Sequence, residues 1–221
     1  MTTSNSRDFN LDVAEVIEEA YERCGLEVRS GYDAKTARRS LNLMFAEWAN
    51  RGLNLWTVKQ GTITLTQGLA QETLLDDVVD LLDVVLRRNN TDFTVERISR
   101  GDYSTFPNKT TQGRPSQYWF DRQVAPIINL WSVPENSTDQ LVYYYVRRIQ
   151  DADTLVNTTD MPFRFFPCMV AGLAYYISMK RAPERLSMLK SVYEEEFQRA
   201  ADEDSGRTPL KLQPSLSYLR V

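Results

Sequence analysis

The sequence contains no histidine and only two cysteines among its 221 residues. The lack of histidine excludes Ser–His and Cys–His nucleophilic pairs, imidazole acid–base catalysis and every zinc site that needs a histidine ligand. Cys24 and Cys168 lie far apart and form no CxxC cluster, so we expect buried thiols and no disulfide framework. Carboxylate chemistry remains open, but the composition favours a binding or structural protein over an enzyme.

A long hydrophobic run is also missing. The longest apolar stretch extends from Phe165 to Met179, and Pro167 and Gly172 interrupt it. It is shorter than the ~20 residues that a membrane-spanning helix needs. The first ten residues are polar and lack the apolar segment of a secretory signal. We therefore expect neither secretion nor a membrane partner.

Neither sign of charge dominates the chain as a whole. The 26 basic and 30 acidic residues give a net charge of −4, and 42% of the residues are apolar. This composition is typical of a globular protein and predicts no general basic coat for duplex phosphates. The tail from Ser205 to Val221 is the exception, because it has three basic residues and no acidic one. Residues 1–204 thus carry a net charge of −7, and the tail carries +3.

Three acidic clusters invite a catalytic or metal-binding interpretation. None has the paired carboxylates of a glycosidase or the alternating ligands of a calcium loop, so we interpret them as solvated surface. Phosphate-binding loops and nucleophile elbows are absent as well. The sequence therefore predicts no catalytic, cofactor-binding or metal-binding residue. The clusters are Asp76, Asp77, Asp80 and Asp83, then Glu194–Glu196, and then Asp202–Asp204.

Two amphipathic helices are predicted in the first quarter of the chain. The first extends from about Asn10, its cap, to Cys24, where a glycine follows. The second extends from Asp33, its cap, to Arg51, and has the clearest apolar stripe of the sequence. A short loop joins the two helices, so we expect an antiparallel helical hairpin.

Two further helices are predicted towards the C-terminus. The third begins near residue 160, where Thr159 or Asp160 can cap it and Pro162 suits the first turn. From Phe166 onward its residues are apolar on nearly every side, which indicates burial on more than one face. The last helix is predicted over Pro183–Asp204.

Between these helical pairs the pattern changes to that of strands. The glycine in Lys59-Gln60-Gly61 predicts a hairpin turn between Leu55–Val58 and Thr62–Thr66. A second hairpin is predicted around Arg88–Asp92, between Val79–Arg87 and Phe93–Ile98.

The second hairpin has an alternative, because the apolar spacing over Leu74–Leu86 also fits a helix.

Three further strands follow, and turn residues separate them. Six or seven short strands at these spacings are typical of a compact sandwich or barrel-like module. The three strands are Tyr118–Phe120, Ile127–Trp131 and Leu141–Ile149.

Together these elements predict an α+β fold. The N-terminal and C-terminal helical pairs would form a four-helix bundle with an inserted antiparallel β module, followed by an extended C-terminal arm. The predicted units are residues 1–52 and 160–205 for the helical bundle, 53–159 for the β-rich module and 206–221 for the arm.

The predicted arm combines basic and apolar residues with two prolines. This chemistry suits an extended segment that docks on a partner, and a strand that closes the chain's own sheet is the alternative. The candidate partner-binding residues are Arg207, Leu210, Lys211, Leu212, Leu216, Tyr218, Leu219, Arg220 and Val221.

Pairs of basic residues alternate along the chain with the acidic clusters. Patches of both signs suit contacts between the subunits of a ring, although ordinary surface charge explains them equally well. The candidate inter-subunit residues are Arg38, Arg39, Arg147, Arg148, Lys180 and Arg181.

Four segments resemble those of a known family. They are Phe45-Ala46-Glu47-Trp48-Ala49-Asn50-Arg51-Gly52-Leu53-Asn54-Leu55-Trp56, Ser99-Arg100-Gly101-Asp102-Tyr103, the run from Asn108-Lys109 to Tyr118-Trp119, and Leu173-Ala174-Tyr175-Tyr176. In these segments, and in the order of its elements from about Phe9 to Asp204, the chain is similar to the head-to-tail adaptor proteins of tailed bacteriophages, also called tail accessory or head completion proteins. The similarity is greatest to those of short-tailed phages.

The resemblance implies a structural virion protein at the neck, made in the host cytoplasm. It implies a ring, commonly of twelve copies, between the portal protein and the tail nozzle or tube protein. The helical bundle would pack around the portal, the arm would extend along the portal, and the β module would face the tail. The ring would continue the DNA channel without specific DNA binding, help to retain packaged DNA, and act in ejection.

Two other functions compete with this one. A carboxylate-dependent hydrolase of cell-wall glycan, associated with the phage tail, would need two carboxyl groups that face each other across a groove, one with a raised pKa. A sequence-nonspecific DNA binder would need a basic surface, which the composition disfavours.

Overall fold

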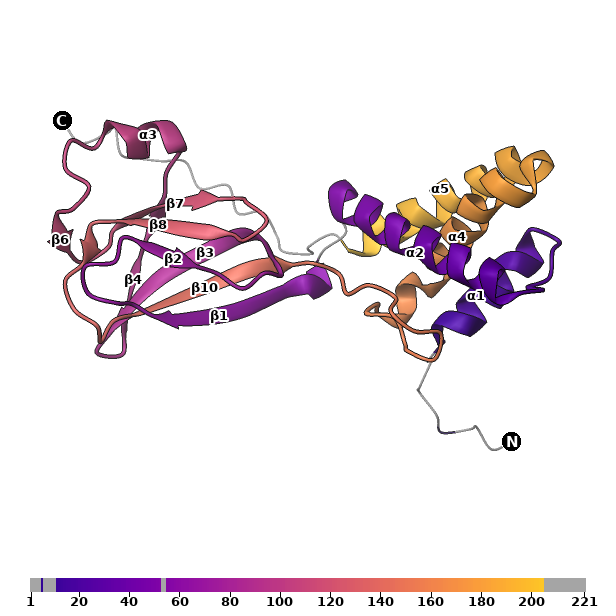
Figure 1. The fold of residues 1–221 in the computed structure, drawn as a ribbon, viewed down its shortest axis with the longest axis horizontal. Coiled ribbons are helices and arrows are strands. Elements are labelled where there is room, and N and C mark those ends of the chain that lie inside the picture. Colours follow the sequence, from indigo (N-terminus) through magenta and orange to yellow (C-terminus); the bar gives the residue numbers. More distant parts are fainter. Residues whose placement is uncertain (1–4, 6–10, 53–54, 205–221) are drawn as a thin grey trace, which may run out of the picture.

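The computed structural model describes residues 5, 11–52 and 55–204. The four long helices and the sheets occupy opposite ends of the long axis of the molecule (Figure 1), and this mixture of helix and sheet confirms the predicted α+β class. We call the two parts the helical region and the β region. The helical region combines segments from both ends of the sequence, whereas the β region comes from the middle.

The helical region contains four long helices and three short 3-10 segments. Its last two helices, α4 and α5, make close contact, and α1 and α2 both pack on α4. The helices are α1 (Val13–Arg23), α2 (Gly31–Arg51), α4 (Phe166–Arg181) and α5 (Leu186–Glu203), and the 3-10 segments are Leu55–Thr57, Phe163–Phe165 and Pro183–Arg185.

Three of the predicted helix caps are wrong. The cap of α1 is Asp12, because it forms a capping box with Glu15 that satisfies two backbone amides at once. Asn10 lies outside the described residues. The cap of α2 is Ser30, whose hydroxyl accepts a hydrogen bond from the amide of Asp33, so Asp33 lies within the first turn.

The third correction concerns the start of α4. A 3-10 turn precedes the helix, and neither Thr159 nor Asp160 caps it. Asp160 instead binds Arg147 at the end of the sheet. The predicted burial of this helix on more than one face is confirmed, since an unbroken run from Cys168 to Ala174 is buried.

The β region contains two four-stranded sheets and one two-stranded sheet. Their strand orders are β1-β10-β3-β4, β2-β8-β7-β5 and β6-β9. The strands are β1 (Val58–Thr64), β2 (Gln71–Thr73), β3 (Val78–Arg88), β4 (Thr91–Thr94), β5 (Glu96–Arg97), β6 (Gln112–Gly113), β7 (Gln117–Asp121), β8 (Ile127–Trp131), β9 (Val133–Pro134) and β10 (Gln140–Arg147), with the short helix α3 (Arg100–Thr105) between β5 and β6.

The first predicted hairpin is wrong. Residues 58–64 form the single strand β1, which continues through Gly61 without a turn. It pairs with β10, the last strand of the β region in sequence. The ring of Tyr143 lies over Gly61, where a Cβ atom would be only 2.4 Å from Tyr143 Cζ. The glycine therefore provides space for an aromatic ring and not a turn.

The second predicted hairpin is confirmed, and the helical alternative for Leu74–Leu86 is wrong. Strands β3 and β4 pair directly, and the turn is shorter than predicted because Asn89 and Asn90 alone adopt positive φ angles of 50° and 59°. Two asparagines with this backbone are typical of a two-residue hairpin turn.

The sheets are mostly antiparallel, but not entirely as predicted. Strand β5 pairs with β7 in parallel, and so does β6 with β9. Each of these parallel pairs includes a two-residue strand, β5 or β6, and these two strands flank the segment that contains α3. The chain leaves β5, forms α3 and returns through β6 before it enters β7.

Each region has its own cluster of buried apolar side chains. The cluster of the helical region includes Ile17, Trp48 and Leu173, and that of the β region includes Leu86, Ile128 and Leu141. Both Cys24 and Cys168 are buried free thiols, as predicted. No helix within the described ranges is long and apolar enough to cross a membrane.

Candidate interaction surfaces

Each acidic cluster contains at least one carboxylate that forms an ion pair with an arginine. Asp80 on β3 contacts both Arg97 and Arg122, and Glu194 on α5 contacts Arg51 at 2.7 Å. Across residues 11–52 and 55–204, no three potential metal ligands gather at one point. The glycan hydrolase alternative has no support in this part of the chain.

Two carboxyl groups have a pKa below the usual range. The hydrogen bond from Arg87 lowers the pKa of Asp92. Burial raises the pKa of Asp160, but the hydrogen bonds from Arg147 and from the Gln150 amide outweigh this, so the net shift is downward. A glycosidase needs an acid with a raised pKa, so neither group is suited to that role.

Arg147 ties the β region to the helical region. Its guanidinium, 8% exposed, donates to both oxygens of Asp160, with Nη2 at 2.8 Å from Oδ1. The indole of Trp56 donates to the carbonyl of the same aspartate at 2.9 Å, and the ring centroids of Trp56 and Phe165 are 4.6 Å apart. These contacts hold the end of β10 against the start of α4.

The other predicted basic residues fall into two groups. Lys180 and Arg181, at the end of α4, contact α2, with Lys180 Nζ at 2.6 Å from Ser40 Oγ and Arg181 Nη2 at 2.7 Å from Asp33 Oδ1. Arg38, Arg39 and Arg148, by contrast, have no ion pair to any described residue.

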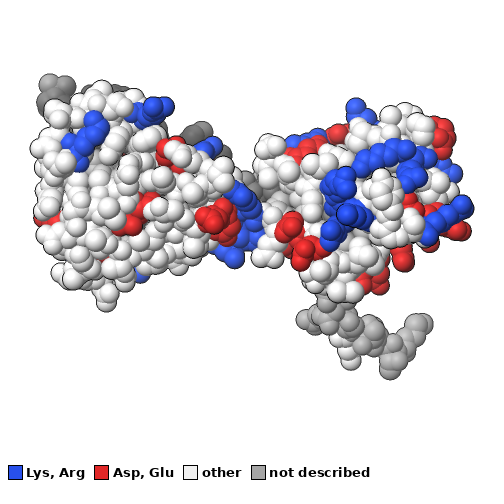
Figure 2. Space-filling view, in the orientation of Figure 1, with Lys and Arg blue, Asp and Glu red and all other residues white. Residues whose placement is uncertain are grey.

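Figure 2 shows basic side chains gathered in a band across the helical region, whereas the visible face of the β region is largely uncharged.

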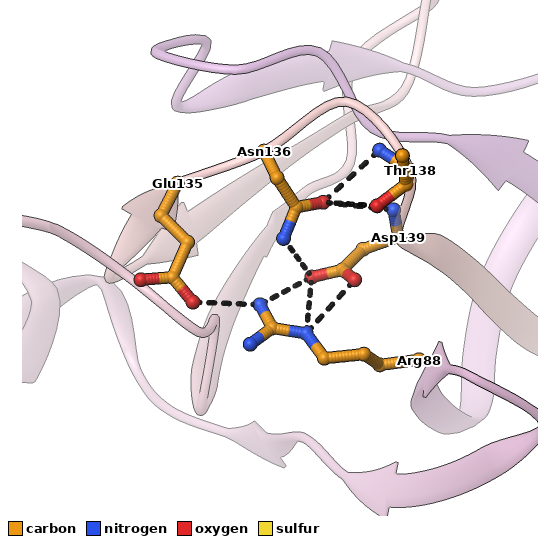
Figure 3. Close-up of polar contacts among 5 residues, drawn as sticks. All are labelled: Arg88, Glu135, Asn136, Thr138 and Asp139. Carbon is orange, nitrogen blue, oxygen red and sulfur yellow. Dashed lines mark hydrogen bonds and ion pairs between the residues drawn. The ribbon is translucent and has the colours of Figure 1, made fainter.

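A charged network fixes the loop before β10 (Figure 3). Arg88, at the end of β3, binds Asp139 through both Nε and Nη2, and Glu135 through Nη2 at 2.8 Å. Asp139 is 1% exposed, and the Asn136 side chain accepts hydrogen bonds from the amides of Thr138 and Asp139. The network therefore holds the loop before β10 against the end of β3.

A second polar network lies within the helical region, and the sequence did not predict it. Glu47 accepts hydrogen bonds from Tyr176 at 2.9 Å and Tyr193 at 3.1 Å, and the buried Trp48 indole donates to Tyr193 at 2.9 Å. Arg51 bridges Glu47 and Glu194. Burial and the contact with Glu47 raise the pKa of Tyr176 to about 12, so its hydroxyl stays a donor.

The segments that carry the family resemblance have structural roles. Ser99 and Asp102 form the capping box of α3, and Tyr103 packs on Trp119 with ring centroids 5.7 Å apart. The carbonyl of Asn108 accepts from the Trp131 indole at 3.2 Å. These residues attach α3 and its loop to the second sheet.

An open groove of about 860 Å³ lies between α1 and the start of α4. Its rim carries four glutamates of α1, and its floor is apolar. Glu15 belongs to the capping box and Glu19 pairs with Arg23, whereas Glu18 and Glu22 have no ion pair within the described ranges. The lining consists of Leu11, Glu15, Glu18, Glu19, Glu22, Arg23, Phe163, Phe166, Pro167 and Val170.

The predicted partner-binding arm, residues 206–221, lies outside the described residues. Its assignment stays a prediction from sequence.

Comparison with known proteins gives one result for the chain. A search of curated proteins found no match. A family model described as SU10 adaptor protein matches residues 11–213, which include all of the helices and strands described above. The chain therefore belongs to the SU10 adaptor protein family.

Proposed function

We propose that the chain is a structural protein of the phage virion and acts as a head-to-tail adaptor between the portal and the tail nozzle or tube. The family match carries this proposal, because it covers both the helical region and the β region. The polar networks support it too, since they link secondary-structure elements to one another.

The two regions would perform different tasks. The helical region, residues 1–52 and 160–205, would act as a four-helix bundle that packs on the portal. The β region, residues 53–159, would face the tail. The separate apolar clusters support this division, because each region can keep its own shape when it contacts a different neighbour.

Several copies would form a ring, with twelve as the expected number, and the ring would continue the DNA channel. A net charge of −7 over residues 1–204 would repel the phosphates of the duplex, so that DNA could slide through without sticking. Among the basic pairs, Arg38, Arg39 and Arg148 are our candidates for contacts between copies, because the others already have partners within the chain.

Sedimentation with portal rings tests the proposal. The full chain mixed with purified portal rings is expected to move with them on a density gradient, and a chain that stays at the top of the gradient would contradict the adaptor function. Deletion of Gly206–Val221 is expected to weaken portal attachment but to leave the secondary structure, measured by circular dichroism, unchanged.

A matched variant keeps the length and charge of the arm but replaces Leu216, Tyr218 and Leu219 with serine. We expect it to bind as weakly as the deletion, because apolar burial supplies most of the docking energy. Full binding by both variants would rule out the arm as the portal contact.

A further inference from the structure

The groove between α1 and α4 combines an apolar floor with an acidic rim. Glu15, Glu18 and Glu22 lie on one face of α1 at helical spacing, and the floor includes Phe166 and Val170 of α4. A groove of this kind suits a peptide segment that has apolar side chains and basic groups beside them.

The chain itself contains such a segment. Residues 205–221 include Arg207, Lys211 and Arg220 and no acidic residue, and apolar side chains alternate with these basic groups. The tail carries +3 and the rest of the chain −7, so the two attract each other overall. Charge complementarity therefore favours this segment over an acidic or purely apolar partner.

The segment also starts close enough to reach the groove. Arg164 Nη2 lies 3.9 Å from the carboxylate of Asp204, the last described residue, and Arg164 directly follows Phe163 of the groove lining. An extended chain spans up to ~3.3–3.6 Å per residue. The remaining residues are thus long enough to cross the groove. Attachment to the same chain gives the segment an effective concentration of order mM.

We propose that, in the free protein, residues 205–221 of the same chain dock in the groove between α1 and α4. The basic side chains lie along the glutamate rim, and the leucines contact the apolar floor. A portal would then have to compete with the groove for this segment. The proposal concerns the protein before assembly and does not depend on the identity of the partner.

Cysteine cross-linking in the full-length free protein tests the proposal. One variant carries Glu18→Cys in the groove and Leu212→Cys in the segment. The control carries Ser191→Cys with Leu212→Cys, because Ser191 is exposed on α5 and lies only ~20 Å along that helix from Asp204. The native thiols stay unreactive, since Cys24 and Cys168 are buried and burial raises the pKa of both.

Under mild oxidation we expect the groove pair to form an internal disulfide about tenfold faster than the control pair. This ratio corresponds to a preference of ~1.4 kcal/mol for the groove. Non-reducing electrophoresis should show a monomer of increased mobility. Equal rates for the two pairs would overturn the proposal. A covalent dimer as the main product would overturn it too, by assigning the groove to the segment of a second copy.

Charge reversal provides an independent test in the same system. Glu22→Lys is expected to slow the groove cross-link several-fold, and added salt should slow it in the original pair because screening weakens the attraction. Glu195→Lys on α5 is the control and should change nothing, since Glu195 does not line the groove. A cross-linking rate unaffected by Glu22→Lys and by salt would contradict the role of charge.

Discussion

The helical region and the β region each depend on one glycine at which a ring packs against the backbone. In α4, a Cβ atom on Gly172 would lie 2.4 Å from Met44 Sδ and 2.8 Å from the ring of Tyr193. In β1, a Cβ atom on Gly61 would meet the ring tip of Tyr143. In both regions a residue that resembles a break in the sequence pattern is in fact a site of close packing.

The regions differ in where they place polar groups. The helical region includes a hydrogen-bond network among Glu47, Trp48 and Tyr193 that reaches into its core. In the β region the buried Asn129 accepts a hydrogen bond from Gln71, and the main ion-pair network, around Arg88 and Asp139, lies at the end of β3. Buried polar groups in folded proteins are nearly always hydrogen-bonded, and each region satisfies these groups with its own residues. Substitutions should therefore affect the two regions separately.

The largest effect is expected from buried leucines. Leu173→Ala in the helical core and Leu86→Ala in the β core each remove a side chain with 0% exposure, at a cost of about 2–5 kcal/mol of unfolding free energy. If the regions unfold separately, each variant lowers only the transition of its own region in calorimetry. Leu43→Ala and Leu82→Ala, both exposed, are the controls and should change little. One shared transition that shifts equally in both variants would contradict two independent cores.

The next effect should be confined to the β region. Arg88→Met leaves the buried Asp139 carboxylate without its main cation, which we expect to cost about 3 kcal/mol in denaturant unfolding. Arg87→Met is the neighbouring control, because its pair with Asp92 is exposed and should contribute much less to stability. Equal losses in the two variants would show that burial of Asp139 does not matter.

Smaller effects should come from the two glycines. Gly172→Ala and Gly61→Ala each overpack a ring contact, with an expected cost of about 1–3 kcal/mol. The loss should be smaller for Gly61, because only the far end of Tyr143 has to move. Gly31→Ala at the start of α2 has open space around it and should be neutral or slightly stabilising. Thermal unfolding that ranks Gly31→Ala with the other two would contradict the packing role.

The smallest expected effect is a dependence on acid at the junction of the regions. The pKa of Asp160 is lowered in the folded protein, so its contribution is present above the unfolded value of about 3.9 and is lost as the pH falls through the lower folded value. When the pH falls from above to below about 4, the unfolding free energy measured with denaturant should decrease less for Asp160→Asn than for the unchanged chain. Identical pH profiles for the two proteins would rule out this contribution.

Much of the fold could be predicted from local patterns. The bounds of β8 match the prediction at Ile127 and Trp131, and α2 ends at Arg51, followed by a left-handed glycine, as expected. These elements follow from short-range signals, namely apolar periodicity and a C-terminal glycine.

The rest could not be predicted, because it depends on partners far away in the sequence. Gly61 becomes intelligible only when β10 brings Tyr143 over it, and Glu47 acquires its role only when α4 and α5 supply two tyrosines. Asp160 resembles a helix cap, but the distant Arg147 binds it instead. The groove arises from the packing of α1 against α4, so the sequence of neither segment alone predicts it.

An image of the full chain bound to portal rings tests the central claim most directly. The account predicts a closed ring of copies on the portal, with the helical region of each copy on the portal side and the β region facing away from it. Single copies scattered over the portal, or a ring attached through the β region, would contradict it.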